Sequence, residues 1–521
     1  MVQIRKLDLR RLIGNQATRM RRLLMMNCQK TIQDTHVHYD PPGNVILILF
    51  IILFFAFSYV HQLTYRSSTP VSRLNLLHSL VLRGTFRIDS YHENTSNKSI
   101  HHGHYYSDKA PGVTVLALPA FALAVGLLDW LDIPLDSDVG WLASSWIACS
   151  GSLGIIAALG GVALFVWLCE WVPPKIACIT TLALFLGAAP LIYCTLMVSH
   201  GLVVGLLAIS LWAANFGRNE TRPACRVLNW RVSVTGVCCG VALASEYSSG
   251  IVVVAILGWL AISDCKRIFS LALGAIPALM LIPAYHWICF GTPFTVAYLH
   301  EAVFTQMHEG FFGINFPPKA EAAYSLLFSS RVGLFSCSPV LLLSFVGYCQ
   351  LYAISRAMFW IAYLVPFMQV VAISGYFLPE GGMMYGPRFL APILVILSVP
   401  TALGIARFPR LGYLLASASI VITVLVTVVD IAPVPRDWPL VEFYLASFIQ
   451  GRFSPNLGTV LGLERWASLA PLLLFMSVGI WLVWRLLPRH TNPDRFRFGA
   501  GNAKPSVIRS EEEQNSSEGH N

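Results

Sequence analysis

The stretch LASSWIACSGSLGIIAALGGVALFVWLC, residues 142–169, contains no charged side chain. A helix needs about 20 apolar residues to cross a hydrocarbon core of about 30 Å. Similar apolar runs recur along almost the whole chain of 521 residues, of which 55% are hydrophobic and only 12% charged. Soluble domains carry roughly twice that share of charge. The sequence therefore predicts an all-α membrane protein that crosses the bilayer many times, because helices satisfy their own backbone hydrogen bonds in lipid.

Twelve stretches have the length and composition of membrane-spanning helices. They are residues 45–63, 142–169, 176–195, 198–216, 231–247, 249–264, 267–290, 335–353, 356–376, 388–407, 410–432 and 467–487. We expect a polytopic bundle of about twelve transmembrane helices with both termini in the cytoplasm. The predicted parts are a basic N-terminal segment (1–44), the transmembrane domain (45–487) and a disordered polar tail (488–521).

A further apolar piece, residues 112–130, is harder to place. If it crossed the membrane, basic loops such as the one holding Arg407 and Arg410 would face outward. Positive residues are enriched in cytoplasmic loops, so we expect a re-entrant or juxtamembrane helix here. The acidic turn that follows then lies outside, in a long outer loop formed by residues 64–141.

The net charge of +9 does not indicate a nucleic-acid partner. The Lys and Arg residues are scattered through short loops and the termini, which is a pattern of membrane topology. Most of the twelve cysteines fall inside apolar runs, where Cys behaves as a small hydrophobic residue. We therefore predict no disulfide framework and no Cys-based metal site.

The outer loop contains the stretch IDSYHENTSNKSIHHGHYYSDKAPG, from Ile88 to Gly112, which concentrates acids, histidines and tyrosines beside a membrane. Polar groups in this position are candidates for function. A carboxylate whose pKa is raised by partial burial can act as a general base. We interpret Asp89 as the first candidate base, with Asp108 and Glu93 behind it. The alternative is that such a residue caps a helix or pairs with a neighbour.

Three cations are candidates for binding a phosphate. Lys109 follows Asp108 directly, and Arg331 and Arg388 stand at the outer ends of two apolar spans. The arginine fork matches phosphate oxygens in a bidentate way. The alternatives are that Lys109 pairs with Asp108 and that the arginines reach for lipid headgroups.

Other polar residues of the outer loops could line a substrate cavity. They are His104, Tyr106, His200, Glu246, Tyr247 and Tyr385. The alternative for a histidine or glutamate in a tight turn is local satisfaction by backbone amides. The loop histidines lack the spacing of a fixed transition-metal site. A loosely held Mg²⁺ or Mn²⁺ that bridges carboxylate and phosphate stays open, since these ions favour oxygen ligands.

Three motifs carry a resemblance to a known family. They are SDKAPG (Ser107–Gly112), GLFSCSP (Gly333–Pro339) and GGMMYGPRFLAP (Gly381–Pro392). Together with the many spans, they resemble GT-C glycosyltransferases of the family that includes protein O-mannosyltransferases and lipid A aminoarabinose transferases. That family carries an Asp-Glu pair just after its first span, whereas TYRSSTPVSRLNLLHSL (Thr64–Leu80) holds no carboxylate here.

The resemblance implies an enzyme that moves a sugar from a polyprenyl-phosphate carrier to a lipid or glycan acceptor, with inversion at the sugar. The expected location is a bacterial inner (plasma) membrane, with the active site on the extracytoplasmic face. The rival interpretations are a multi-pass transporter or lipid-linked oligosaccharide flippase, and a non-catalytic scaffold. Transporters usually place ionisable residues within their spans, and the spans here are nearly free of charge.

Overall fold

The computed structural model describes residues 40–62, 68–217, 229–263, 267–432 and 438–488. These residues belong to one compact unit. The predicted N-terminal segment, up to residue 39, and the predicted tail, from residue 489, lie outside the described residues.

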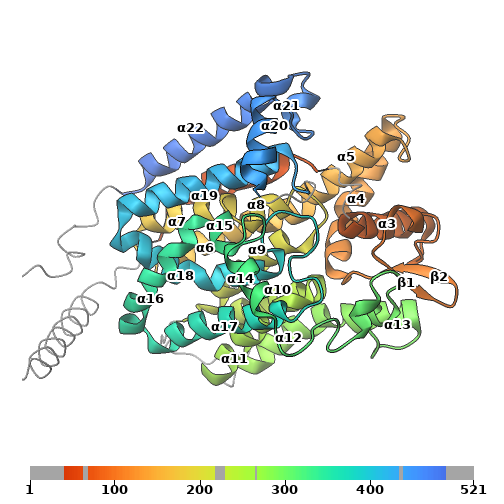
Figure 1. The fold of residues 1–521 in the computed structure, drawn as a ribbon, viewed down its shortest axis with the longest axis horizontal. Coiled ribbons are helices and arrows are strands. Elements are labelled where there is room, and N and C mark those ends of the chain that lie inside the picture. Colours follow the sequence, from red (N-terminus) through yellow and green to blue (C-terminus); the bar gives the residue numbers. More distant parts are fainter. Residues whose placement is uncertain (1–39, 63–67, 218–228, 264–266, 433–437, 489–521) are drawn as a thin grey trace, which may run out of the picture. The chain divides into compact units, whose positions relative to one another are not determined.

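The described chain is almost entirely helical (Figure 1). The helices are α2 (Gly43–Tyr59), α3 (Ser68–Arg83), α4 (Gly112–Trp130), α5 (Asp138–Cys149), α6 (Ile155–Leu168), α7 (Pro174–Leu186), α8 (Ala189–Tyr193), α9 (Ser199–Ala214), α10 (Trp230–Ser245), α11 (Gly250–Ser263), α12 (Ile268–Leu279), α13 (Leu281–Phe290), α14 (Ala320–Phe328), α15 (Leu334–Cys337), α16 (Leu343–Ile354), α17 (Arg356–Ser374), α18 (Leu394–Arg407), α19 (Pro409–Val429), α20 (Ala446–Ile449), α21 (Leu457–Val460) and α22 (Ala470–Leu486).

Each of the twelve predicted spans overlaps at least one of these helices, which confirms the all-α, multi-span architecture. Within the described ranges, seven helices are long and apolar enough to cross a membrane. They are Gly112–Trp130, Asp138–Leu168, Ile268–Phe290, Arg356–Ser374, Arg388–Arg407, Pro409–Val429 and Arg465–Leu486. The other predicted spans are shorter apolar helices, so the count of twelve crossings stays a prediction.

Glycines allow several helices of the bundle to approach closely. A Cβ atom on Gly160 of α6 would come within 2.3 Å of the Cα atom of Gly205 on α9. A Cβ atom on Gly347 of α16 would come within 1.7 Å of the carbonyl oxygen of Pro400 on α18. Small residues are the usual device for close helix contact in membranes, where water does not drive association.

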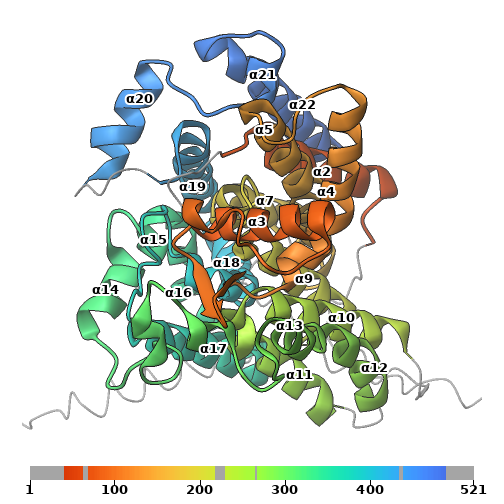
Figure 2. The same cartoon turned by 90° about the vertical axis from the view of Figure 1, so that its right-hand side faces the viewer.

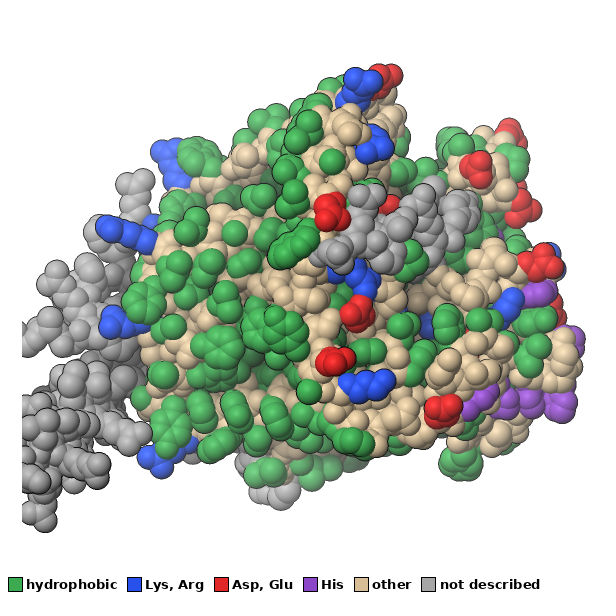
Figure 3. Space-filling view, in the orientation of Figure 1, with side chains coloured by type: hydrophobic (Ala, Val, Ile, Leu, Met, Phe, Trp, Pro, Cys, Tyr) green, Lys and Arg blue, Asp and Glu red, His purple; other side chains and the backbone are tan. Residues whose placement is uncertain are grey.

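The two ends of the bundle differ in charge. Arg388 precedes α18 and Arg407 ends it, so these two arginines lie at opposite ends. Figure 3 shows Lys and Arg side chains at the left end, whereas most acidic side chains and all visible histidines lie toward the right. Figure 2 views the bundle from the end that carries the acids and histidines.

Helices α3 and α4 lie at this acidic end. The first residue of α4, Gly112, packs against Ser245, where α10 ends. Helix α4 then runs beside α5, which begins at Asp138. Helix α4 is long and apolar enough to span a membrane, so its expected position along the membrane surface stays a prediction.

The outer loop also contains a β-hairpin, which the prediction of an all-helical chain did not include. Strand β1 (Lys98–His101) pairs antiparallel with β2 (His104–Ser107). The turn is formed by His102 and Gly103, with φ of +48° and +79°. Two residues of positive φ are the signature of the tight hairpin turn that matches strand twist. The hairpin ends at Ser107 and thereby fixes the start of the Asp108–Lys109 pair.

Candidate active site

The hairpin meets a second loop that is distant in sequence. Ser99 on β1 forms an antiparallel bridge with Glu301. The Ala302 amide donates to the Lys98 carbonyl at 2.9 Å, and the Ser99 hydroxyl donates to the Ala297 carbonyl at 2.7 Å. These backbone contacts hold Glu301 beside the end of the hairpin, where Asp108 lies.

Asp108 is completely buried. Its Oδ2 atom accepts a hydrogen bond from Lys109 Nζ at 2.6 Å and a weaker one from Asn97 Nδ2 at 3.5 Å. Its Oδ1 atom is also buried and accepts no hydrogen bond within the described structure. A buried carboxylate oxygen without a donor is costly, so this atom is poised to receive a proton or a ligand donor.

Glu301 is the second buried carboxyl at this point. Its Oε1 atom accepts from the backbone amides of Val303 and Phe304 at 3.3 and 3.5 Å, whereas Oε2 has no partner among the described residues. Glu301 and Asp108 are within hydrogen-bonding reach of each other. Burial, with the negative charge of Asp108 in support, raises the pKa of Glu301 to about 8, although Lys109 acts in the opposite direction.

Arg73 on α3 reaches into the same region and is only 2% exposed. Its guanidinium donates to the Met197 carbonyl at 3.2 Å and to Ser199 Oγ at 3.4 Å, while its Nε atom has no partner in the described structure. Burial lowers the pKa of Arg73, and the negative charges of Glu246 and Asp108 oppose this shift. An arginine remains charged under these conditions, so Arg73 is a buried cation.

Glu246 follows α10 directly and lies close to the beginning of α9. Its Oε2 atom accepts from Ser199 Oγ at 2.6 Å, and its Oε1 atom accepts from Ser248 Oγ at 3.1 Å. His200 Nδ1 lies 3.9 Å from the same Oε2 atom. Glu246 is thus held in place by hydroxyl groups, and its charge faces Arg73 across Ser199.

Arg388 enters from the loop that precedes α18. Its guanidinium lies 4.9 Å from the ring centre of Phe389, and its Nη1 atom is 3.6 Å from the sulfur of Met384. Its buried Nε atom has no partner in the described structure. Arg388 is within electrostatic range of Arg73 and Glu246. A buried arginine and a half-buried one within electrostatic range of each other favour an anionic ligand nearby.

Tyrosines line the space around these charges. The rings of Tyr247 and Tyr298 meet edge to face at 5.8 Å, and Lys109 Nζ lies 6.0 Å from the ring centre of Tyr298. The ring centres of Tyr376 and Phe389 lie 5.5 Å apart. The hydroxyl of Tyr247 is buried and has no partner among the described residues. Aromatic faces with polar tips suit a sugar, which presents both C–H and hydroxyl groups.

Six of the sequence candidates thus gather in one cluster, which we call the acid–arginine cluster. They are Asp108, Lys109, His200, Glu246, Tyr247 and Arg388, and the structure adds Arg73, Glu301, Tyr298 and Tyr376.

The structure places four other candidates outside this cluster, namely Asp89, Glu93, His104 and Tyr106. Asp89 accepts hydrogen bonds from the Tyr105 amide at 2.7 Å and pairs with His104 Nδ1 at 2.9 Å, and both side chains are well exposed. Glu93 is exposed in a short helical turn. These contacts fasten the hairpin to the segment before it, which is a structural role. Tyr106 lies on β2, where its ring packs against Phe290.

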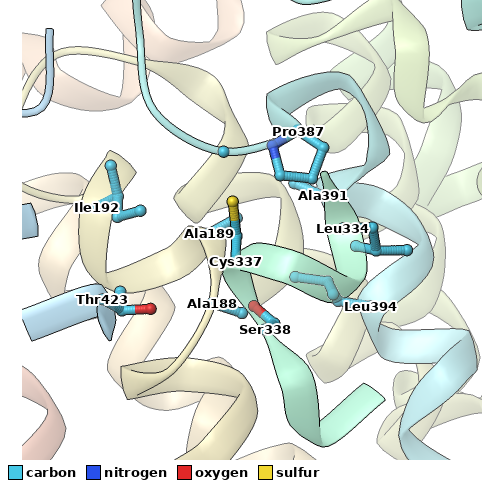
Figure 4. A pocket seen from close by; sticks show the side chains of 11 residues that line it. Ala188, Ala189, Ile192, Leu334, Cys337, Ser338, Pro387, Ala391, Leu394 and Thr423 are labelled. Atoms are coloured by element: carbon cyan, nitrogen blue, oxygen red, sulfur yellow. The ribbon is translucent and has the colours of Figure 1, made fainter. Parts of the chain in front are cut away.

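Arg331 and Tyr385 belong to a neighbouring group. Arg331 forms an ion pair with Glu380 and donates to the Gly382 carbonyl at 2.7 Å. The Tyr385 ring packs edge to face on Tyr444. Figure 4 shows a narrow apolar cleft lined by side chains such as Ile192, Leu334, Cys337, Pro387 and Leu394. Arg331 already has a carboxylate partner, whereas Arg388 forms no ion pair with any residue that the structure describes.

Sequence reasoning missed Arg73 and Glu301 for different reasons. Arg73 stands in a segment of mixed polarity that contains no carboxylate. The one available signal was an arginine flanked by apolar residues on what proves to be a mostly buried helix. Glu301 lies in a loop rich in aromatics, and only its pairing with β1 singles it out. Within the described ranges, no three His, Cys, Asp or Glu side chains are placed to hold a metal ion.

No protein-family model matches the sequence, and no curated protein sequence matches it significantly. Among solved structures, the fold is similar to that of ArnT from Cupriavidus metallidurans, crystallised with undecaprenyl phosphate. The TM-score is 0.43 and the sequence identity 12%, over 85% of this chain and 76% of that one.

Proposed function

We propose that this protein is a membrane glycosyltransferase that transfers a sugar from a polyprenyl-phosphate carrier to a hydroxyl group of a lipid or glycan acceptor. The observation that carries the proposal is the acid–arginine cluster, in which a buried Asp108 contacts Lys109 and lies within electrostatic range of Arg73, which in turn lies within range of Arg388. The sequence motif SDKAPG lies within it. A lipid-linked donor explains why such a site belongs to a protein with many apolar helices.

The chemistry has two requirements that the cluster can meet. The acceptor oxygen bonds to the anomeric carbon of the sugar while its proton passes to Asp108. The bond between that carbon and the phosphate oxygen breaks, and its electron pair stays on the phosphate. Lys109, Arg73 and Arg388 stabilise the charge that develops on the leaving phosphate, since preorganised cations in a buried site act strongly.

Asp108 is preferred over Asp89 as the base. Asp108 is fully buried and has one oxygen without a donor, whereas Asp89 is exposed and bonded to the hairpin. A base needs an open oxygen toward the reacting hydroxyl and an environment that keeps water away. His200, Glu246 and Tyr247 then belong to the walls of the cavity.

The test is a transfer assay in membranes with a labelled polyprenyl-phosphate sugar. We expect Asp108→Asn to lower the rate of sugar attachment by about a hundredfold or more, the usual share of general base catalysis. Asp89→Asn is the matched control and should stay within a few-fold of the native rate. Loss of transfer in Asp89→Asn alone would assign the role of base to Asp89.

The same assay separates the rival function. Labelled sugar that crosses the membrane without becoming attached to any acceptor would identify a transporter and overturn the proposal. In a parallel reaction a chelator is added first and Mg²⁺ or Mn²⁺ is then restored. The rate of sugar attachment in each step decides whether a divalent ion helps the phosphate to leave.

A further inference from the structure

We propose that Asp108 and Glu301 form one proton-sharing carboxyl pair, and that the pair rather than Asp108 alone receives the proton of the acceptor. The existence of the pair rests on the geometry of the two side chains. Its catalytic use rests on the proposed function.

The hydrogen bonds of the two carboxyl groups are complementary. In each group one oxygen accepts hydrogen bonds. Asp108 Oδ2 accepts from Lys109, and Glu301 Oε1 accepts from backbone amides. In each group the other oxygen, Asp108 Oδ1 or Glu301 Oε2, is buried without a donor. The two groups lie within hydrogen-bonding reach. Two ionised oxygens would repel each other there, whereas one proton between them satisfies both.

The backbone holds this arrangement in place. Asp108 follows the last residue of β2, and Glu301 is bridged to Ser99 in β1. The Tyr285 hydroxyl donates to the Ser107 carbonyl at 2.6 Å and ties α13 to the same strand. Both residues are therefore fastened to one hairpin by backbone contacts.

The charged and titratable groups around the pair come from several elements. They are Lys109 beside Asp108, Arg73 on α3, Tyr285 on α13, and Tyr247, Tyr298 and Tyr376 from the neighbouring loops. Lys109 is the only one in direct contact with a carboxylate oxygen of the pair. With one shared proton the pair carries a single negative charge, which Lys109 balances.

The upward shift in the pKa of Glu301, to about 8, agrees with this geometry because burial and Asp108 both favour its protonated form. Glu301 therefore holds a proton at neutral pH, and this is the proton that the two carboxyl groups share. In the reaction the pair accepts a second proton from the acceptor hydroxyl and changes from one negative charge to none. That proton then passes to water, and the pair returns to its starting state.

The first experiment needs no activity. Infrared spectroscopy of the purified protein in lipid should show the carbonyl band of a protonated carboxyl at pH 7, which disappears as the pH rises past about 8. Glu301→Gln should remove this band. Glu93→Gln, an exposed glutamate of the same outer region, is the control and should keep it. A band that persists unchanged in Glu301→Gln would overturn the pair.

The second experiment measures the pH profile of sugar transfer. In the native protein we expect turnover to fall above about pH 8, because loss of the shared proton leaves two facing negative charges. Glu301→Gln should lose this alkaline limb, reduce kcat about tenfold and leave KM for the donor unchanged, since an amide donates to Asp108 but cannot give up its proton. Glu301→Asp should restore a fall of turnover at alkaline pH.

The two failures are distinguishable. If the native protein attaches no sugar to any acceptor, the proposed function falls while the infrared result still decides whether the pair exists. If transfer occurs and Glu301→Gln has the native pH profile, the pair has no role in the reaction.

Discussion

At the scale of single residues, the buried arginines are the most informative feature. Arg73 and Arg388 are charged side chains in a bundle that is otherwise built for lipid, and each keeps a buried Nε atom without a partner in the described structure. Burial of a charge is costly unless a ligand or a counter-charge compensates. The nearby carboxylates Asp108 and Glu246 compensate in part, and a phosphate would complete the balance.

The arginine variants give a direct prediction. Arg73→Gln and Arg388→Gln should each lower transfer about ten- to hundredfold, since one hydrogen bond to a charged group is worth about 1.5–3 kcal/mol. Arg73→Lys should recover part of the rate because it keeps the charge but not the fork. Arg83→Gln, at the exposed end of the same helix, is the matched control. Equal rates for Arg73→Gln and Arg83→Gln would contradict a role of Arg73 in the site.

The carboxyl of Glu301 should also make stability depend on pH. Its pKa in the folded protein is about 8, above its ordinary value of 4.5, so the folded state binds more protons between these values. Stability is then greatest at low pH in this window and is lost as the pH rises through 8. We expect the melting temperature of the native protein in detergent to fall by a few degrees from pH 6 to pH 9. Glu301→Gln should show a smaller fall in melting temperature. The same fall in both proteins would refute the assignment of this pH dependence to Glu301.

At the scale of elements, glycine contacts set how closely the helices pack. Gly160 on α6 leaves no room for a side chain against Gly205 on α9, whereas Gly258 on α11 has open space around it. Gly160→Val should therefore force α6 and α9 apart and lower stability by about 1–3 kcal/mol, the usual cost of overpacking. Gly258→Ala should be neutral or slightly stabilising. Thermal unfolding in detergent would show the contrast, and similar losses in both variants would argue against the close packing of α6 and α9.

The hairpin shows how an element carries the site. Its tight turn is formed by His102 and Gly103. Asp108 directly follows β2, and Glu301 is bridged to Ser99 in β1. The sequence indicated a polar loop rich in functional groups, and it favoured Asp89 within that loop. The order of candidates changes in the structure because Asp89 is used to fasten the hairpin.

At the scale of the whole molecule, labelling can test on which side of the membrane each loop lies. The prediction places residues 64–141 on one side of the membrane, with α4 lying along the surface. Cysteines introduced at the exposed positions Gly103 and Asp136 should then both react with an impermeant reagent applied from the same side. A cysteine at Arg410, exposed at the basic end, should react only after the membrane is opened. Labelling of Gly103→Cys and Asp136→Cys from opposite sides would show that α4 crosses the membrane. The native chain measures the labelling of its own cysteines.

The sequence by itself determined that this is a bundle of apolar helices, because the length and composition of each run suffice to predict a helix in lipid. It also located the polar loop with Asp108 and Lys109, since charged residues stand out against an apolar chain. Only the tertiary structure decided that Arg73, Glu301 and Arg388 lie beside them. These residues are far apart in sequence, and their meeting depends on the pairing of the hairpin with a distant loop and on how α3 crosses the end of the bundle. No local pattern records such contacts.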